Sequence, residues 1–173
     1  AQNYLNSKIF AVDLSKKSLV YAKRKVKESK IDNVKFFHGD ILDLNNLDSK
    51  FDIIECVGVL HHMKEPLKGL DILLNLLEPY GYMKLGLYSE IARKNIKLAR
   101  NLIKKKNYKN KFEDIINFRQ EIIKEKTNES FVKILNKVDF FSTSGVRDLL
   151  FNVQEHLFTL PKISKILSDF NLE

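Results

Sequence analysis

Two aspartates, Asp13 and Asp40, each come directly after a short run of strand-forming residues. A carboxylate at such a place can accept two hydrogen bonds from a ribose diol, or one from an exocyclic amine. Gly39 lets another group approach the backbone, and Ile41 offers a backbone donor and an apolar wall. Taken singly, Asp13 is equally suited to the N-terminus of the following helix, where a carboxylate favours the helix dipole. Gly39-Asp40 alone is equally typical of an ordinary turn. Together they favour a nucleoside-binding site.

Two adjacent histidines, His61 and His62, are the candidate catalytic residues. An unperturbed imidazole titrates at about pH 6.5, so either residue could act as a general base. The alternative is that they shape a pocket or cap a helix. Because adjacent side chains point apart, we expect no metal site here. Cys56 lies in an apolar run and is interpreted as a small buried hydrophobe rather than a nucleophile.

Alternating strands and helices must position these residues in the first half of the chain. We expect strands at 9–12, 34–37, 51–60 and 82–88, a helix after Ser15, and a second helix from Pro66 until Pro79 and Gly81 break it. This alternation predicts an α/β fold with a doubly wound, mostly parallel sheet and right-handed crossovers. Ligands of such sheets bind beyond the carboxyl ends of the strands.

The second half of the chain has helical periodicity instead. We expect helices at 91–106, 112–126 and 131–138, a helix start at 142–144, and a last helix from Pro161 to about Phe170. We therefore divide the chain into a partial cofactor-binding α/β core, residues 1–90, and a helical region of the same domain, residues 91–173. This region could cover the strand ends as a substrate lid, with pocket residues Arg147, Gln154, Glu155 and His156. Pairing on helix surfaces is the alternative for these four.

Composition favours one folded domain in a reducing compartment. The chain has 173 residues, of which 44% are hydrophobic and 30% charged, and its single cysteine cannot form an internal disulfide. No apolar run reaches the length of a membrane span, and no signal peptide opens the chain. We expect a cytoplasmic protein without a membrane partner.

The net charge of +8 would suit a nucleic-acid partner. We do not expect one, because the lysines are spread along the predicted helices and the bias fits overall composition. An RNA or protein modifier that docks through a lysine cluster is the alternative, and its binding would depend on salt. The cluster comprises Lys104, Lys105, Lys106, Lys109 and Lys111.

Four short motifs in order resemble the class I S-adenosylmethionine-dependent methyltransferases over about residues 8–90. They are Phe10-Ala11-Val12-Asp13-Leu14-Ser15, His38-Gly39-Asp40-Ile41, Phe51-Asp52-Ile53-Ile54-Glu55-Cys56 and Leu60-His61-His62-Met63. The later runs at 147–151, 154–156 and 158–161 resemble methyltransferase domains attached to tetratricopeptide-repeat proteins. The first resemblance implies a Rossmann-like fold, and the second implies attachment to such a repeat segment.

The resemblance also implies a cofactor, S-adenosylmethionine, and a role for each matching residue. Asp13 would hold the ribose hydroxyls, Leu14 would pack on the adenine, and Gly39, Asp40 and Ile41 would meet the adenine edge. Cys56, Val57 and Gly58 would lie under the methionine part, and His61 and His62 near the transferring methyl group. The implied reaction is in-line methyl displacement, with an acceptor, small molecule or protein, that the sequence does not reveal.

The family's glycine-rich loop after its first strand has no counterpart here. We interpret the chain as truncated before this loop. The methyltransferase prediction therefore concerns the whole protein, and this fragment need not be active alone. In the family's sheet order the missing strand lies between the strands ending at Asp13 and near Leu60. We therefore expect a sheet that is open at its centre, with unpaired backbone groups.

Two alternative functions stay open. A nicotinamide-dependent oxidoreductase also places an acidic residue where Asp13 stands, but Gly39-Asp40 and the segment 60–63 fit the methyltransferase pattern better. The other alternative is a non-catalytic module that keeps the methyltransferase fold for binding or regulation.

Overall fold

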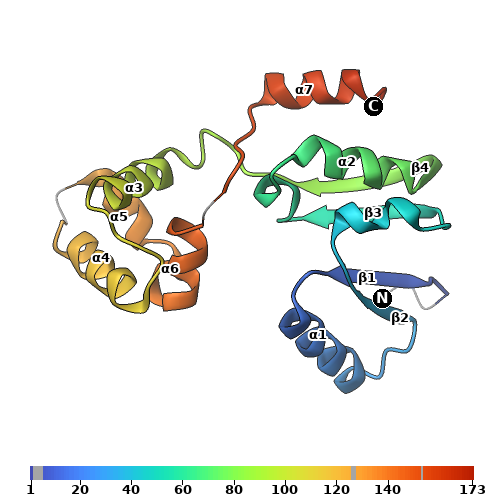
Figure 1. Ribbon diagram of the computed structural model, residues 1–173, viewed down its shortest axis with the longest axis horizontal. Helices are drawn as coiled ribbons and strands as arrows, with labels where there is room; N and C mark the ends of the chain where they lie inside the picture. The colour runs from blue at the N-terminus through green and yellow to red at the C-terminus, as the bar shows by residue number, and fades with distance from the viewer. Residues whose placement is uncertain (2–5, 126–127, 153) are drawn as a thin grey trace. The chain divides into compact units, whose positions relative to one another are not determined.

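The computed structural model describes residues 1, 6–125, 128–152 and 154–173, and this part of the chain forms four strands and seven α-helices (Figure 1). The first elements are β1 (Ile9–Asp13), α1 (Lys16–Glu28), β2 (Val34–His38), the 3-10 helix η1 (Ile41–Asn46), β3 (Phe51–Val57), the 3-10 helix η2 (Leu60–His62), α2 (Pro66–Asn75) and β4 (Leu77–Gly86). The later elements are α3 (Lys94–Lys105), α4 (Phe112–Lys124), α5 (Glu129–Leu135), the 3-10 helix η3 (Val138–Phe141), α6 (Thr143–Leu150) and α7 (Leu160–Asp169).

The chain folds into two compact units. Unit 1 comprises Ala1–Cys56 and Glu65–Lys84, and unit 2 comprises Val57–Lys64 and Leu85–Glu173. The short segment 57–64, which carries both histidines, thus packs with the helical second half. The division into a cofactor-binding core at 1–90 and a lid at 91–173 stays a prediction.

In unit 1, β1, α1 and β2 form the predicted β-α-β arrangement. The two strands are parallel, with Asp13 opposite His38. Ser15 caps α1 by accepting a hydrogen bond of 3.2 Å from the Ser18 amide, as predicted. The apolar face of α1 is half-buried.

Strands β3 and β4 form a second, separate pair. The Phe51 amide donates to the Leu76 carbonyl at one end of the pair, and the Gly58 amide donates to the Gly86 carbonyl at the other, so the two strands run in the same direction. The described strands therefore make two parallel pairs, β1-β2 and β3-β4. As expected, the sheet is open between β1 and β3, where the centroids of the Phe10 and Phe51 rings lie 5.4 Å apart in an edge-to-face arrangement.

The boundary between α2 and β4 differs from the expectation. The helix ends at Asn75, and β4 starts at Leu77, so the strand includes Pro79 and Gly81 instead of following them. Tyr80 has a φ of 65°, and a side chain at Gly81 would meet the carbonyl oxygens of Asp52 and Glu78 at 2.9 Å. The two supposed helix breakers therefore lie inside a strand.

Unit 2 has a helical core made by side chains of α3 to α6 and η3. Ile115, Phe118, Ile122, Phe140 and Val146 are fully buried there. As predicted, Ser142 caps α6 and Pro161 lies in the first turn of α7; the α7 cap, Thr159, was not predicted. Helix α5 starts at Glu129 rather than Phe131, and Val138 belongs to η3. Lys126, the expected end of α4, lies outside the described residues.

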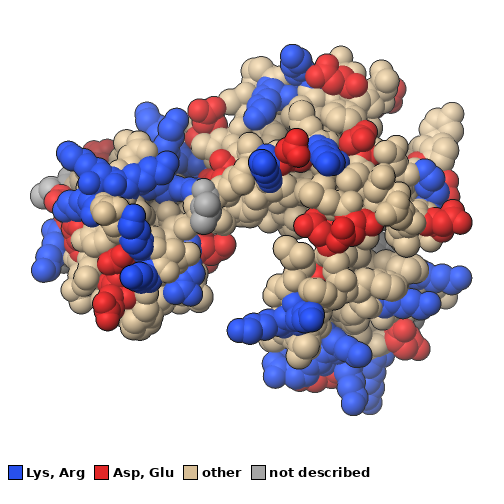
Figure 2. Space-filling model, viewed as in Figure 1, with Lys and Arg blue, Asp and Glu red and all other residues tan. Residues whose placement is uncertain are grey.

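The face that Figure 2 shows differs in charge between the helical part and α1. Basic and acidic side chains are mixed over the helices α3 to α6, whereas α1 carries mostly basic ones. None of the described helices combines the length and the apolar character that a bilayer span requires.

Candidate functional site

The structure brings Asp13 and Asp40 to adjoining strand ends in unit 1. The Gly39 amide donates to the Asp13 carbonyl over 3.3 Å, which places the residues after β1 and β2 side by side. Asp13 is exposed, and its Oδ1 accepts from the Ser15 amide at 2.7 Å. Oδ2 has no partner among the described residues, so this exposed oxygen can accept further hydrogen bonds.

Asp40 has the same arrangement at the start of η1. Its Oδ1 accepts from the Leu42 amide at 3.0 Å and caps the 3-10 helix, while its Oδ2 has no partner in the described part of the chain. Ile41 is half-buried. A Cβ added to Gly39 would meet nothing within 4 Å. Asp40 therefore has the local capping role expected of a Gly-Asp turn, and its Oδ2 can still accept a hydrogen bond.

The residue after β1 is held in place by a histidine that sequence analysis did not single out for a role. His38 Nε2 lies 3.0 Å from the Leu14 carbonyl oxygen, so this nitrogen is the protonated donor. Leu14, which follows Asp13 directly, is 67% exposed, so its apolar side chain is accessible from solvent.

The end of β3 contains the other predicted cofactor residues. Cys56 is buried, as expected of a small hydrophobe. Val57 is exposed and contacts Gly86, where an added Cβ would come within 2.6 Å of Val57 Cγ1. Gly58 has a φ of 79°, a conformation that favours glycine, and no atom lies within 4 Å of the place a Cβ would take.

The His61 ring is buried in unit 2 against an aromatic partner. It is 1% exposed and stacks on Tyr88, with 3.7 Å between ring centroids. Arg93 Cζ lies 3.5 Å from the same Tyr88 centroid. Two groups at these distances cannot share one ring face, so Tyr88 lies between the imidazole and the guanidinium. Such stacks combine aromatic and cation-π attraction.

This environment keeps His61 uncharged. Burial is the main cause that lowers the pKa of His61 to about 4; the nearby His62 and Arg93 also lower it, whereas the Gly86 carbonyl and Asp148 raise it. Neither ring nitrogen makes a well-formed hydrogen bond to the described residues. A base this weak is a poor proton acceptor near neutral pH, so the buried ring is better suited to support its neighbours.

His62 is half-buried and has polar partners from a distant part of the chain. Its Nδ1 lies 3.1 Å from the Gln154 carbonyl oxygen and 3.1 Å from Asn152 Nδ2. The His61 and His62 rings lie edge to face, with 4.3 Å between their centroids. The expectation that the two side chains point apart was therefore wrong. The described residues still contain no group of three or more potential metal ligands.

Glu155 joins two arginines behind the histidines. Its Oε1 lies 3.1 Å from Arg93 Nε and its Oε2 lies 2.8 Å from Arg100 Nη1. The Glu155 side chain is only 5% exposed, and Arg100 also donates to the Asn152 carbonyl. Two guanidinium groups and one carboxylate give these three side chains a net positive charge.

Three of the four predicted pocket residues thus gather around the histidines. Gln154, Glu155 and His156 belong to this cluster, whereas Arg147 is exposed and pairs with Asn110 at 2.9 Å. Four further residues of this cluster were not predicted, because no local motif links them to the histidines: Tyr88, Arg93, Arg100 and Asn152.

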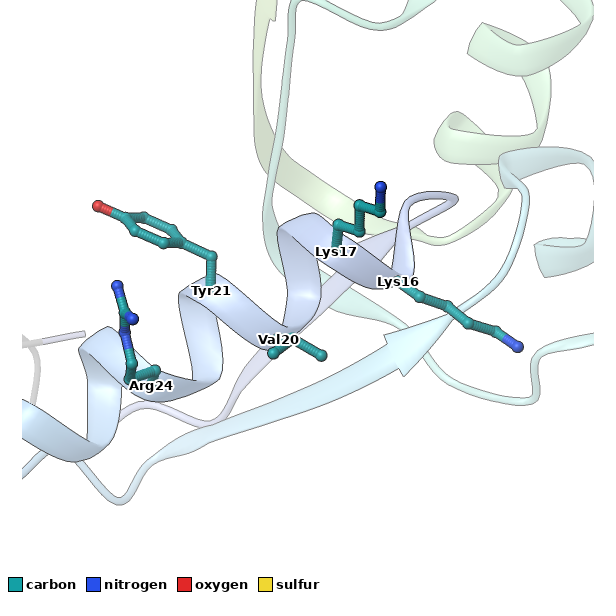
Figure 3. A pocket seen from close by; sticks show the side chains of 5 residues that line it. All are labelled: Lys16, Lys17, Val20, Tyr21 and Arg24. Carbon is teal, nitrogen blue, oxygen red and sulfur yellow. The ribbon is translucent and has the colours of Figure 1, made fainter.

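A shallow hollow of about 350 Å³ lies on the surface of α1 (Figure 3). Its lining residues are Lys16, Lys17, Val20, Tyr21 and Arg24. Arg24 lies over the Tyr21 ring, 5.3 Å from its centroid. The hollow contains no carboxylate or imidazole, so we do not place the predicted chemistry there.

Comparison with known proteins identifies the first half of the chain. Residues 1–90 match the family model described as a methyltransferase domain. An uncharacterized protein of Synechococcus sp. is 34% identical over 99 residues, which are 57% of this chain and 24% of that protein. An uncharacterized protein of Rickettsia prowazekii is 37% identical over 83 residues, 47% of this chain and 33% of that protein. The matches thus span a third or less of these relatives.

The fold recurs in a solved structure. PKMT2 from Rickettsia typhi superposes on 98% of this chain with a TM-score of 0.73 and 22% identity, and the match covers 34% of that protein. A second structure of PKMT2, in complex with AdoHcy, gives a TM-score of 0.71 over 98% of this chain and 35% of that one, again at 22% identity. The likeness includes the helical second half and establishes the fold.

Proposed function

This chain belongs to the methyltransferase domain family, and from that premise we propose that it binds S-adenosylmethionine and transfers a methyl group to an acceptor by in-line displacement. The arrangement at the ends of β1 and β2 is the main support for this proposal. Asp13 and Asp40 each use one carboxylate oxygen in a local turn and keep the other for a ligand.

The residues of unit 1 fit the adenosine half of the cofactor. Asp13 accepts hydrogen bonds from the ribose hydroxyls, and Asp40 accepts one from the adenine amino group. The exposed Leu14 packs on the flat face of the base, and the Ile41 backbone meets its edge. The open space over Gly39 leaves room for the ring. The AdoHcy complex of PKMT2, a protein of the same fold, supports this choice of ligand.

Residues at the end of β3 accompany the methionine part in this proposal. Cys56, Val57 and the backbone of Gly58 line it, and the positive φ of Gly58 keeps a side chain from that place. When bound, S-adenosylmethionine supplies an electrophilic methyl group on a sulfonium sulfur, which leaves as a neutral thioether. The protein needs no nucleophile of its own and contributes position and proton removal.

The two histidines take different parts. We assign His62 as the general base that accepts the proton released by the acceptor, because its ring is half-buried rather than enclosed. We assign His61 as a positioning residue, since its buried neutral ring contacts His62 and Tyr88. This division refines the prediction that either histidine is catalytic.

That the acceptor is a small molecule or a protein stays a prediction. So do the attachment to a tetratricopeptide-repeat segment and the cytoplasmic location. The expected absence of nucleic-acid and membrane partners also stays a prediction. No observation on the described residues favours the non-catalytic module, so that function is kept only as an outcome of the test below.

Calorimetric titration of S-adenosylmethionine tests the proposal. Asp13→Ala should weaken binding at least about tenfold, because it removes charge-assisted hydrogen bonds to the ribose. Asp48→Ala is the matched control, since Asp48 is also an exposed aspartate of unit 1 and has no partner among the described residues. Equal affinity for S-adenosylmethionine in folded Asp13→Ala and Asp48→Ala would contradict the ribose assignment, and no binding to the unaltered protein would favour the non-catalytic module.

A further inference from the structure

We propose that four residues after α6 form a strap that fixes the protonation tautomer of His62, and that Glu155 is the positioning residue that anchors this strap. The strap residues are Asn152, Gln154, Glu155 and His156. This inference rests on the proposed function, because the tautomer matters only if His62 removes a proton from the acceptor.

The anchor of the strap is an ion triad. The Glu155 carboxylate lies between Arg93, at 3.1 Å, and Arg100, at 2.8 Å, and it is nearly inaccessible to solvent. Arg100 donates a further hydrogen bond to the Asn152 carbonyl. A planar guanidinium can make both contacts at once, so a single arginine sets the position of two strap residues.

Backbone and side-chain bonds then hold the strap against the segment that carries the histidines. The His156 amide donates to the His61 carbonyl at 2.8 Å. The Gln154 side-chain amide lies 3.2 Å from His156 Nε2 and reaches the Lys64 carbonyl at 3.5 Å. The strap therefore contacts the chain on both sides of His62, and the His62 ring has little freedom to turn away.

The partner of His62 Nδ1 decides where the proton lies. A backbone carbonyl can only accept, so the 3.1 Å contact with the Gln154 oxygen requires a proton on Nδ1. The Asn152 amide is compatible with this state when its oxygen, rather than its nitrogen, faces the ring. A deprotonated Nδ1 would instead face the carbonyl with a lone pair.

A neutral imidazole with its proton on Nδ1 has a lone pair on Nε2. In this tautomer Nε2 can take up the proton that the methyl-accepting nucleophile releases, because its lone pair is free. The strap thus holds His62 Nδ1 as a hydrogen-bond donor, so that Nε2 is the base. A carbonyl or carboxylate orients other catalytic histidines in the same way.

Nitrogen-detected NMR of the histidine rings tests the inference without cofactor or acceptor. In the unaltered protein at a pH where His62 is neutral, we expect the Nδ1–H tautomer to dominate. Glu155→Gln should at least double the fraction of the Nε2–H tautomer, since a neutral amide anchors the strap less firmly. Glu90→Gln is the matched control, because Glu90 is an exposed glutamate of unit 2 whose side chain has no partner among the described residues.

A second variant keeps the test decisive if Glu155→Gln does not fold. Arg100→Lys retains the charge opposite Glu155 but cannot make both contacts of the guanidinium, and it should change the tautomer ratio in the same direction. A dominant Nε2–H tautomer in the unaltered protein, or an unchanged ratio in the folded strap variants, overturns the inference. Titration of S-adenosylmethionine into the same samples separates this failure from failure of the proposed function, which would abolish binding in all of them.

Discussion

The His61 imidazole and the Tyr88 ring stack with their centroids 3.7 Å apart and their planes 26° from parallel. The Arg93 guanidinium covers the other face of Tyr88, so a neutral ring, a phenol and a cation form one stack in which Tyr88 is half-buried. Burial also raises the pKa of Tyr88, which keeps the phenol protonated. The stack links η2, which carries the histidines, to the residues that precede α3.

His61 should be neutral throughout the physiological range. Its pKa is lowered from 6.5 to about 4, so proton NMR of the ring C2 hydrogen should show a midpoint near that value. Because the unfolded chain takes up the proton first, the free energy of unfolding should fall as the pH drops from about 6.5 to about 4, by up to about 3 kcal/mol. A midpoint near the ordinary value would mean that the ring is hydrated.

His61→Phe separates this effect from general acid sensitivity. The substitution keeps a ring against Tyr88 but removes the titrating group, so stability should lose much of its dependence on pH in that window. Urea unfolding at several pH values measures this. An unchanged pH dependence in His61→Phe would assign the effect to other groups.

The Tyr88 ring should matter for stability more than its hydroxyl does. Tyr88→Phe keeps both stacking faces and should change the free energy of unfolding by less than about 1 kcal/mol, whereas Tyr88→Ala should cost about 2 to 4 kcal/mol. Thermal unfolding of both variants checks the difference. Equal losses would show that the hydroxyl, not the stack, carries the stabilisation.

The two glycines of the candidate cofactor site should respond oppositely to alanine. Gly58→Ala places a side chain at a φ of 79° and should cost about 1 kcal/mol of stability or more. Gly39→Ala meets no neighbouring atom, so it should leave stability nearly unchanged and weaken cofactor binding by filling the space over the site. Denaturant unfolding paired with calorimetric titration distinguishes the two effects. Normal binding of S-adenosylmethionine by the Gly39→Ala variant would contradict the assignment of the adenine to the space over Gly39.

The local elements of this fold were predictable because their signals lie within a few residues of each other. Ser15 and Ser142 cap α1 and α6 with their own side chains, and Pro161 starts α7 with a preset φ. The positions of Asp13 and Asp40 after parallel strands followed from the same kind of local pattern. Their meeting at one edge of β1-β2 needed only the β-α-β rule.

The features that were missed depend on contacts between distant segments. Pro79 and Gly81 usually end a helix, but here pairing with β3 keeps them in a strand. Glu155 meets Arg93 and Arg100 across more than fifty residues of sequence, and no periodicity or motif encodes such a pairing. The different burial of His61 and His62 was hidden for the same reason, since His61 is enclosed in a stack with Tyr88 whereas His62 is half-buried.

The most direct test of the central claim is to add S-adenosylhomocysteine to the isotope-labelled protein and follow the backbone amide signals. The adenosine assignment predicts saturable shifts at Leu14, Gly39 and Ile41, the residues beside the two open carboxylates. Saturable binding that leaves these three amides unmoved, or no binding at millimolar ligand, would contradict the claim that the ends of β1 and β2 hold the cofactor.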